Sequence, residues 1–495
     1  MNNYYVHKFL LLLIILFIGV SGVKGQQILT LDSCRFFALE KNKEMTVARK
    51  RMEAATSLKK AAFTQYLPHF NARGAYLYTN KKFQLFNEDK YLPIIPFSAF
   101  NPETGKFDAS RLSIPEIARD VFVINPLTQQ PIVGPDGNPV FRNFALLPAS
   151  QAKFGFENHY IFNASVIQPI FTGFKVRELY RISRYAENIA RENVNLSHAD
   201  IIYKTDEAYW RVLALQYKVA LAHKYKGLLE RLVSDLENVY AEGIITKTDL
   251  LKAKVKLNEA ELILLKANNG LEISKMAMAQ IIGKNYKDIG ILDTTKLHQI
   301  LPEYSVNPEK QVENRAEIGI LKQNVNIATS GVSVMRSRFL PDISLIAGYT
   351  FMNPNPYKGM EKKFGGDWNI GIQASIPIFH WGERIHTMKA MKREAENASL
   401  KLEEARELIN VQINQVFFKY KEAKSRIELT RHSKEQAEEN MNMSRDNFEE
   451  GILMLTDLLE AQVLWEKAYT EYIDALIEAR MCESELLKVT GGIYK

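Results

Sequence analysis

The residues whose types could bind a metal or react are one group of two histidines and a glutamate, and two cysteines. His380, Glu383 and His386 are spaced three residues apart, but three such positions do not share one helix face, so structural or surface histidines are expected. Cys34 and Cys482 have no other thiol near them in the sequence, which excludes structural zinc and leaves a disulfide between them open. Motifs of dinucleotide-binding proteins, P-loop proteins, serine hydrolases and zinc proteases are absent from the sequence, so we expect neither an enzyme nor a cofactor.

The second candidate is the acidic pair Asp457 and Glu460, which directly follows a glycine-containing turn. Residues three apart share a helix face, so the two carboxylates could act together on a cation. The same pattern is also typical of a capping box, with Asp457 as the N-cap and Glu460 at N3. Both interpretations stay open, and they are compatible. Asp249 occupies the equivalent position after an earlier turn, but its partner three residues on is Lys252, which favours a capping role alone.

These turns belong to an internal repeat. Residues 242–255 (EGIITKTDLLKAKV) and 450–463 (EGILMLTDLLEAQV) are identical at nine of fourteen positions, at an offset of 208. The same offset relates Pro169-Ile170-Phe171 to Pro377-Ile378-Phe379. The repeat predicts a domain organisation of residues 26–283 as repeat one, 284–310 as a connecting belt around the helices, and 311–495 as repeat two.

Each repeat predicts long helices and strands. Apolar residues with 4-3 spacing from Ile201 to Tyr240, and again from Ile409 to Ile427, indicate a coiled-coil seam on helices of some 65 to 70 residues. Period-2 alternation predicts two strands per repeat, at about 66–78 and 160–166 and at about 339–351 and 368–378. One strand face is apolar and the other suits water.

Composition and the N-terminus indicate an exported protein. The 495 residues carry a net charge of +7 spread along the chain, which does not indicate a nucleic-acid binder. Residues 1–25 have an apolar core between basic and small polar residues, which predicts a signal peptide. No other stretch contains 18 uninterrupted apolar residues, so any membrane-spanning part must consist of strands. Four strands cannot close a barrel without unpaired edges, so several chains must contribute to one barrel.

Repeat one also has a proline-rich insertion, residues 80–151, with nine of the 17 prolines of the chain. It predicts a long external loop with a small hairpin turning at Pro135-Asp136-Gly137. A lid, a receptor-facing surface, a plug and a variable loop that shields the barrel rim are the alternatives for its role.

The signal peptide, the duplicated helix-strand-strand-helix-helix order, the two Gly-x5-Asp-Leu-Leu turns and the segment NRAEIGIL at residues 314–321 together resemble the TolC-like outer membrane efflux protein family. The resemblance implies an α+β membrane protein in which a trimer builds one twelve-stranded outer-membrane β-barrel and a coiled-coil helical tunnel in the periplasm. It implies as partners outer-membrane lipid, a periplasmic adaptor (membrane fusion protein) and an inner-membrane pump.

The resemblance also assigns roles at the periplasmic tip. Asp457 and Glu460 match the positions that form an acidic ring at the tunnel entrance. The tip turns, which would also dock the adaptor, contain Gly243, Ile244, Asp249, Gly451, Ile452 and Leu453. Some family members lock the tip with an Arg and a Tyr. The corresponding positions of this chain are Leu453 and Phe448, so we predict an apolar gate formed by these two residues.

The predicted function is therefore a trimeric channel that gives passive exit to substrates of a tripartite efflux or type I secretion system, a transport activity of the porin kind. The alternative is an envelope-spanning structural scaffold that a β-barrel anchors. A water-compatible strand face favours the channel, because an anchor needs no polar lumen. The identity of the cargo is not encoded in these patterns.

Overall fold

The computed structural model describes residues 28–80, 83–359 and 361–494. The predicted signal peptide, residues 1–25, lies outside the described residues. The chain forms two compact units: a helical unit (Met1–Gln65, Thr172–Pro341 and Ile376–Lys495) and a sheet unit (Tyr66–Phe171 and Asp342–Ser375). Within the described segments, no helix combines the length and the apolar character that crossing a membrane requires.

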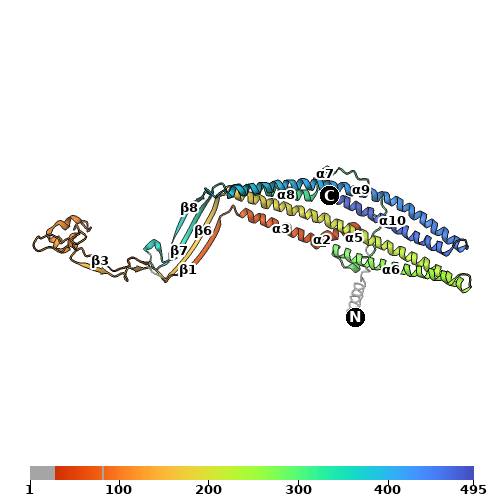
Figure 1. The fold of residues 1–495 in the computed structure, drawn as a ribbon, viewed down its shortest axis with the longest axis horizontal. Coiled ribbons are helices and arrows are strands. Elements are labelled where there is room, and N and C mark those ends of the chain that lie inside the picture. The colour runs from red at the N-terminus through yellow and green to blue at the C-terminus, as the bar shows by residue number, and fades with distance from the viewer. Residues whose placement is uncertain (1–27, 81–82, 360, 495) are drawn as a thin grey trace, which may run out of the picture. The chain divides into compact units, whose positions relative to one another are not determined.

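The helical unit is built from two sets of helices with the same order. In each set, shorter helices precede a strand, and a 67-residue helix is followed by one about half as long; α5 and α6 lie side by side (Figure 1). The helices are α2 (Leu31–Lys41), α3 (Lys43–Thr64), α5 (Lys175–Ala241), α6 (Lys247–Ile282), α7 (Pro308–Val312), α8 (Ala316–Ser337), α9 (Glu383–Glu449) and α10 (Leu455–Val489), with 3-10 turns at Tyr286–Asp288 and Gly492–Tyr494.

The predicted 4-3 seam follows the buried side of both 67-residue helices, except at its last position on α5, where Tyr240 is exposed. On α5 it includes Ile201, Val212 and Leu229, and on α9 it includes Ile413 and Tyr420, all of them buried. Thr205, which interrupts the apolar pattern, is also fully buried, because its hydroxyl donates a hydrogen bond of 2.6 Å to the carbonyl of Ile201. The seam therefore continues through this polar residue.

A buried ion pair fixes three helices of this unit together. Asp206 on α5 accepts two hydrogen bonds from Arg35 on α2, at 2.6 and 2.5 Å, and a third of 2.7 Å from the hydroxyl of Ser484 on α10. Asp206 is almost completely buried, so its charge is not hydrated. The hydrogen bonds from Arg35 and Ser484 stabilise the charge in place of water. The irregular segment that follows α6 bonds to the same helices: Asp293 accepts from Tyr209, and Gln299 accepts from Arg480.

The sheet unit contains one antiparallel four-stranded sheet in the order β1-β6-β7-β8 (Figure 1). The strands are β1 (His69–Tyr78), β6 (Asn158–Phe171), β7 (Asp342–Asn353) and β8 (Gly365–Ser375). All four predicted strands are present. The main difference is that β6 runs past Pro169 to Phe171, where a register irregularity accommodates the proline, which has no N–H to donate. The edges of β1 and β8 have no neighbouring strand within the described sheet.

The insertion in repeat one is more structured than the predicted loop. Two short ribbons, β2 (Phe83–Gln84) with β5 (Lys153–Phe154) and β3 (Lys90–Pro93) with β4 (Phe144–Leu147), lead to a small core that surrounds α4 (Pro115–Val121). This core buries Ala99, Ile117, Ala118, Val121 and Phe122, and it includes the 3-10 turns Phe97–Ala99 and Ala109–Ser113. The predicted hairpin turn is confirmed, because Val133 and Pro139 pair across Asp136 and Gly137.

Candidate functional site

Two helix-to-helix turns carry the predicted tip residues. The α5–α6 turn contains Gly243 with φ 77°, and the α9–α10 turn contains Gly451 with φ 75°, a left-handed conformation that glycine adopts without steric cost. In both turns the backbone continues alike: Ile244 N–H donates to the carbonyl of Val239 at 3.2 Å, and Ile452 N–H donates to that of Asn447 at 2.8 Å. The two turns thus share one backbone design, as their sequence identity predicts.

The helix caps after the turns differ. Thr246 is the N-cap of α6, and its hydroxyl oxygen accepts a hydrogen bond of 3.2 Å from the backbone N–H of Asp249. Met454 is the N-cap of α10, and its side chain forms no capping hydrogen bond with the described residues. The capping-box interpretation of Asp457 and Glu460 is therefore wrong, because α10 begins two residues before Asp457 and places that residue inside the first turn.

The acidic residues consequently have different partners. The carboxylate of Asp249 accepts 2.7 Å from the Thr246 hydroxyl and pairs with Lys252 at 3.3 Å, and these two interactions hold the pKa of Asp249 below its usual value. At the equivalent positions of the second turn, Asp457 and Glu460 are both exposed, and neither forms an ion pair with any other described residue. Of the two equivalent pairs, only Asp457 and Glu460 therefore present two negative charges that no ion pair with another described residue compensates.

The predicted apolar residues of the turns divide into exposed and packed ones. Ile244 and Ile452 are 70% and 71% exposed, whereas Leu453 is half-buried. Phe448 is also half-buried and packs against the core of its own helical unit. Of these predicted residues, the two isoleucines are thus open to a partner in a single chain, and Met454 of the second turn is exposed as well.

A groove between α6 and α10, which the sequence analysis missed, lies beside the acidic pair. It has a volume of about 690 Å³ and an apolar floor, and Glu460 forms part of its wall. Its lining consists of Thr248, Leu251, Lys252, Val255, Lys256, Glu259, Thr456, Leu459, Glu460 and Val463. The sequence does not indicate the groove, because its two helices are about 200 residues apart in the chain. Its only trace in the sequence is the pair of apolar residues Leu251 and Val255 on α6, both of which the structure exposes.

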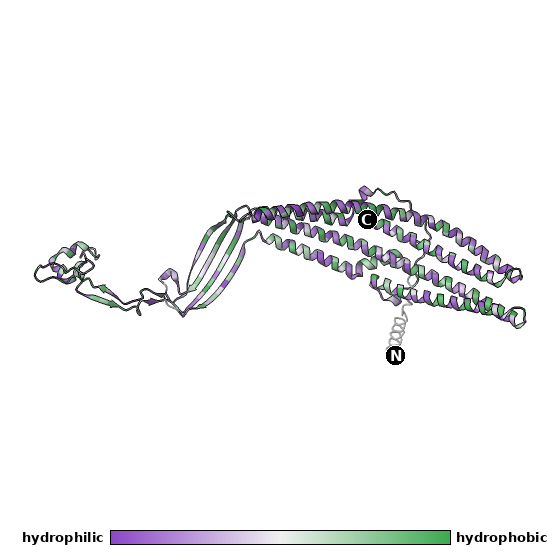
Figure 2. Ribbon diagram, in the orientation of Figure 1, coloured by the Kyte–Doolittle hydropathy of each residue, from purple (hydrophilic) through white to green (hydrophobic). Residues whose placement is uncertain are grey.

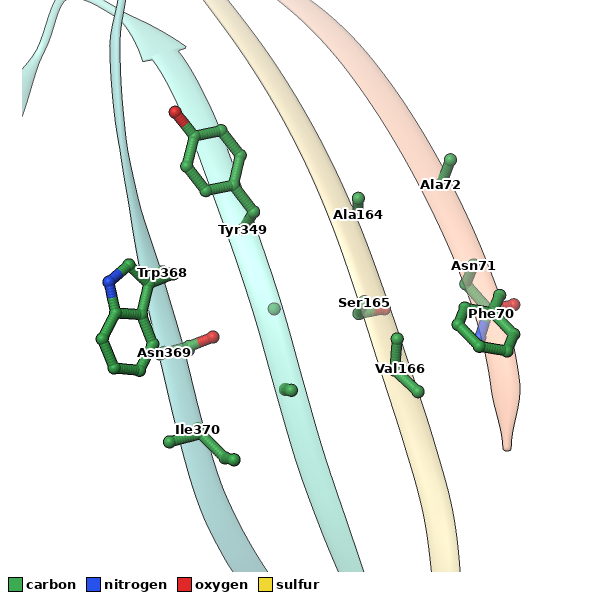
Figure 3. A pocket seen from close by; sticks show the side chains of 12 residues that line it. Phe70, Asn71, Ala72, Ala164, Ser165, Val166, Tyr349, Trp368, Asn369 and Ile370 are labelled. Carbon is green, nitrogen blue, oxygen red and sulfur yellow. The ribbon is translucent and has the colours of Figure 1, made fainter. Parts of the chain in front are cut away.

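The four-stranded sheet has one apolar and one polar face, as the alternation predicts. The register aligns Phe70, Val166, Ala347 and Ile370 across the four strands, and the next row on that face contains Ala72, Ala164, Tyr349 and Trp368 (Figure 3). The middle rows of the opposite face carry Asn71, Arg73, Asn163, Ser165, Thr350, Asp367 and Asn369, and the rows on either side contain Ile161 with Met352 and Ile167 with Ile346. The amide of Asn163 donates 2.9 Å to the hydroxyl of Thr350. Hydrophilic and hydrophobic residues follow one another along these strands (Figure 2).

The apolar face is open in the single chain. Phe70 is 77% exposed, and Trp368, Ile370 and Ile372 are also exposed. So much contiguous apolar surface indicates contact with another apolar phase or another chain. The strands are ten to fourteen residues long, and about ten residues of tilted strand cross a bilayer.

The cysteines and the histidine trio take no part in these features. Cys34 and Cys482 are free, and burial raises the pKa of each thiol to about 11, so both are poor nucleophiles. The disulfide left open by the sequence is not formed. His380 contacts the guanidinium of Arg384 through Nδ1 at 2.9 Å.

Comparisons with known proteins agree with this architecture. The family model described as outer membrane efflux protein matches residues 149–284 and 307–492. The alkaline protease secretion protein AprF of Pseudomonas aeruginosa is 20% identical over 63% of this chain, and the outer membrane protein TolC of Vibrio cholerae is 23% identical over 46%. The matches span only 65% and 55% of those two relatives.

Solved structures share the fold at low identity. The CmeC outer membrane channel of Campylobacter jejuni is 17% identical, with a TM-score of 0.68 over 93% of this chain and 85% of its own. The open state of the MtrE outer membrane channel of Neisseria gonorrhoeae is 15% identical, with a TM-score of 0.68 over 94% and 89%. The resemblance predicted from the sequence is confirmed, and with it the outer membrane location and the non-enzymatic class: the chain belongs to the outer membrane efflux protein family.

Proposed function

We propose that three copies of this chain form one outer-membrane channel that gives passive exit to substrates. The observation that carries the proposal is the open, two-faced sheet. Its edge strands β1 and β8 expose unpaired backbone groups, which in lipid cost several kcal/mol each, so neighbouring copies must pair with them. Three copies of four strands give a twelve-stranded barrel with the apolar face toward lipid and the row of Asn, Ser, Thr and Asp side chains toward water.

The helical unit supplies the entrance in this proposal. Asp457 and Glu460 from three chains form a ring of six carboxylates that favours cations. Phe448 and Leu453 form the apolar gate; because Phe448 already packs within its own chain, its part is to hold the turn that positions Leu453. Equal lengths of α5 and α9 support an origin of the two halves by duplication.

The partners follow from the same surfaces. A helical hairpin of a periplasmic adaptor would dock with apolar residues on the floor of the α6–α10 groove, against the turns that contain Gly243, Ile244, Asp249, Gly451, Ile452 and Leu453. The charged wall, Lys252 and Lys256 opposite Glu460, would fix its register. An inner-membrane pump would supply the energy, and the name of the AprF relative supports secretion of a polypeptide as one form of the activity.

A scaffold anchored by a barrel is the second candidate. It requires the trimer but no conducting lumen, so the polar sheet face argues against it.

Two measurements on the detergent-extracted protein test the proposal. Light scattering, corrected for bound detergent, should give three times the mass of the mature chain, whose precursor has 56.7 kDa. Planar-bilayer recordings should then show discrete channels. A monodisperse monomer would exclude the shared barrel, and a trimer without conductance, even with the adaptor added, would favour the scaffold.

A further inference from the structure

Four segments that join helices to strands come together at one end of the helical unit. The rings of Phe63 and Tyr180 lie 5.9 Å apart, which joins the end of α3 to the start of α5. A Cβ atom at Gly173 would lie 2.7 Å from the carbonyl oxygen of Ser337, so the start of α5 touches the end of α8. Arg384 donates 2.8 Å to the carbonyl of Arg338, which adds the start of α9. We name residues 54–65, 172–187, 331–341 and 376–395 the collar.

The collar is strongly basic, and the opposite turns are acidic. It contains twelve Lys or Arg and four Asp or Glu, whereas residues 230–259 and 437–466 around the two turns contain six and fourteen. All the collar cations except Lys59 and Arg384 are exposed. Several form no ion pair with any described residue, namely Lys60, Lys175, Arg336, Lys389 and Lys392. The collar therefore carries positive charge that its own chain leaves uncompensated.

Exposed apolar side chains lie among these cations. Ile378 is 91% and Trp381 is 90% exposed, and Ile376 and Phe379 are exposed beside them. Trp381 adopts φ 47°, a conformation that non-glycine residues rarely take. Its ring lies 5.0 Å from that of Phe379. Tryptophan is enriched at the headgroup level of bilayers, so an exposed tryptophan within a basic surface is typical of a contact with lipid headgroups.

In the sequence, the collar segments directly adjoin the strands. Lys175 is four residues after the last residue of β6, and Trp381 is six residues after the last residue of β8. We propose that the collar binds the anionic phospholipid headgroups of the leaflet next to these strand ends. Its unpaired Lys and Arg side chains contact the phosphates, while Ile378 and Trp381 insert between the headgroups. This inference rests on the proposed function, in which the strands cross the bilayer.

The proposal commits to anionic lipid because of the charge balance. A zwitterionic leaflet carries no net charge and would leave the excess cations uncompensated. An anionic leaflet attracts each nearby Lys or Arg by about 1 kcal/mol, or roughly fivefold in affinity. The cations are also spread over four separate segments and alternate with apolar side chains, which suits a surrounding leaflet better than one compact protein partner.

The test uses the full-length protein reconstituted in nanodiscs that contain phosphatidylethanolamine and phosphatidylglycerol. Native mass spectrometry counts the lipids of each kind that stay bound. The collar variant K175Q/R336Q/K389Q/K392Q should lose the preference for phosphatidylglycerol, by about fivefold for each cation removed. The control variant K247Q/K266Q/K401Q/K467Q removes the same charge from exposed positions outside the collar and should keep the preference.

Two further measurements keep the proposal open to refutation if the collar variant folds poorly. Wild-type preference should disappear as salt rises, because screening weakens exposed charge pairs. W381A should lower retention of both lipids and leave their ratio unchanged. A preference that survives high salt, or a conducting collar variant with wild-type lipid counts, would overturn the collar proposal and leave the channel intact. Wild-type protein that neither inserts nor conducts would overturn the channel proposal, and the collar proposal with it.

Discussion

The two helix turns of this chain have the same backbone but different electrostatics. In the first turn, Thr246 caps α6 and also donates to Asp249, whose remaining oxygen pairs with Lys252. In the second turn, Met454 and Glu460 replace the threonine and the lysine, and the aspartate is retained as Asp457. One turn is therefore neutralised and well capped, and the other exposes two acids on a helix start without a side-chain cap.

The difference shows that two turns with the same backbone can differ in helix capping and in exposed charge. An N-cap hydroxyl typically stabilises a helix by about 1 kcal/mol, so its absence from α10 is a local cost. Without that hydroxyl and without a lysine at position 460, the carboxylate of Asp457 has no ion-pair partner among the described residues and accepts only a long hydrogen bond of 3.5 Å from the hydroxyl of Thr456. In the proposed channel, the charge of the second turn is the one that would be available to a permeating ion.

The largest expected effect comes from removing that charge. D457N/E460Q should weaken block of the open channel by a multivalent cation at least ~100-fold. The attraction between one carboxylate and one unit of cation charge ~8 Å away in water is about 0.5 kcal/mol, and the proposed trimer has six such carboxylates. Single-channel recordings with the cation on the helical side measure the block. The matched variant D249N/K252Q, at the equivalent positions of the first turn, should stay within about twofold of wild type, since it removes a pair that is already neutral. Equal losses in both variants would contradict the comparison.

The sequence predicts the regular elements of this fold well, because periodicity encodes burial. The 4-3 spacing that contains Ile413 and Tyr420 identifies the α9 seam, and the alternation that contains Tyr349 and Trp368 identifies the sheet faces. Both patterns depend only on the residues of one element and the environment of its two sides.

Features that depend on distant segments could not be predicted. The α6–α10 groove joins Val255 to Val463, and no local spacing indicates that their helices are neighbours. The small core of the insertion collects Ala99 and Phe122 from a proline-rich stretch without periodicity. The capping-box interpretation of Asp457 is wrong for a simpler reason: Asp457 is a favoured N-cap residue type and Met454 is not, yet α10 has its N-cap at position 454.

Exchanging the two caps should change local stability in opposite directions. M454T should stabilise the start of α10, because Met454 has φ −77° and ψ 153°, close to the −80° and 150° of Thr246, so a hydroxyl there can accept from the N–H of Asp457. T246M should destabilise the start of α6. Each change of about 1 kcal/mol corresponds to about fivefold in amide hydrogen exchange of the first helical turn.

Mass spectrometry of exchange in peptides from both helix starts provides the measurement, and each variant serves as the control for the other turn. If M454T left exchange at α10 unchanged while T246M accelerated it at α6, the two backbones would not be equivalent, and the absence of a cap could not explain the freedom of Asp457.

The smallest expected effect is a pH dependence confined to the first turn. The hydroxyl of Thr246 and then the ammonium of Lys252 lower the pKa of Asp249, so the folded helix start binds the ionised carboxylate in preference to the protonated one. A group whose pKa is lower in the folded state contributes stability above its unfolded pKa, about 3.9 for Asp, and loses it as the pH falls through the folded value. Exchange at the start of α6, corrected for the intrinsic rate, should therefore differ between wild type and D249N at neutral pH and converge well below pH 3.9.

T246V removes the larger of the two causes and keeps the carboxylate, so its pH step should be smaller than that of wild type but still present. A step of wild-type size in T246V would mean that Lys252 alone holds the charge of Asp249, and the contrast between the two turns would then depend on the exchange of lysine for Glu460 rather than on the cap.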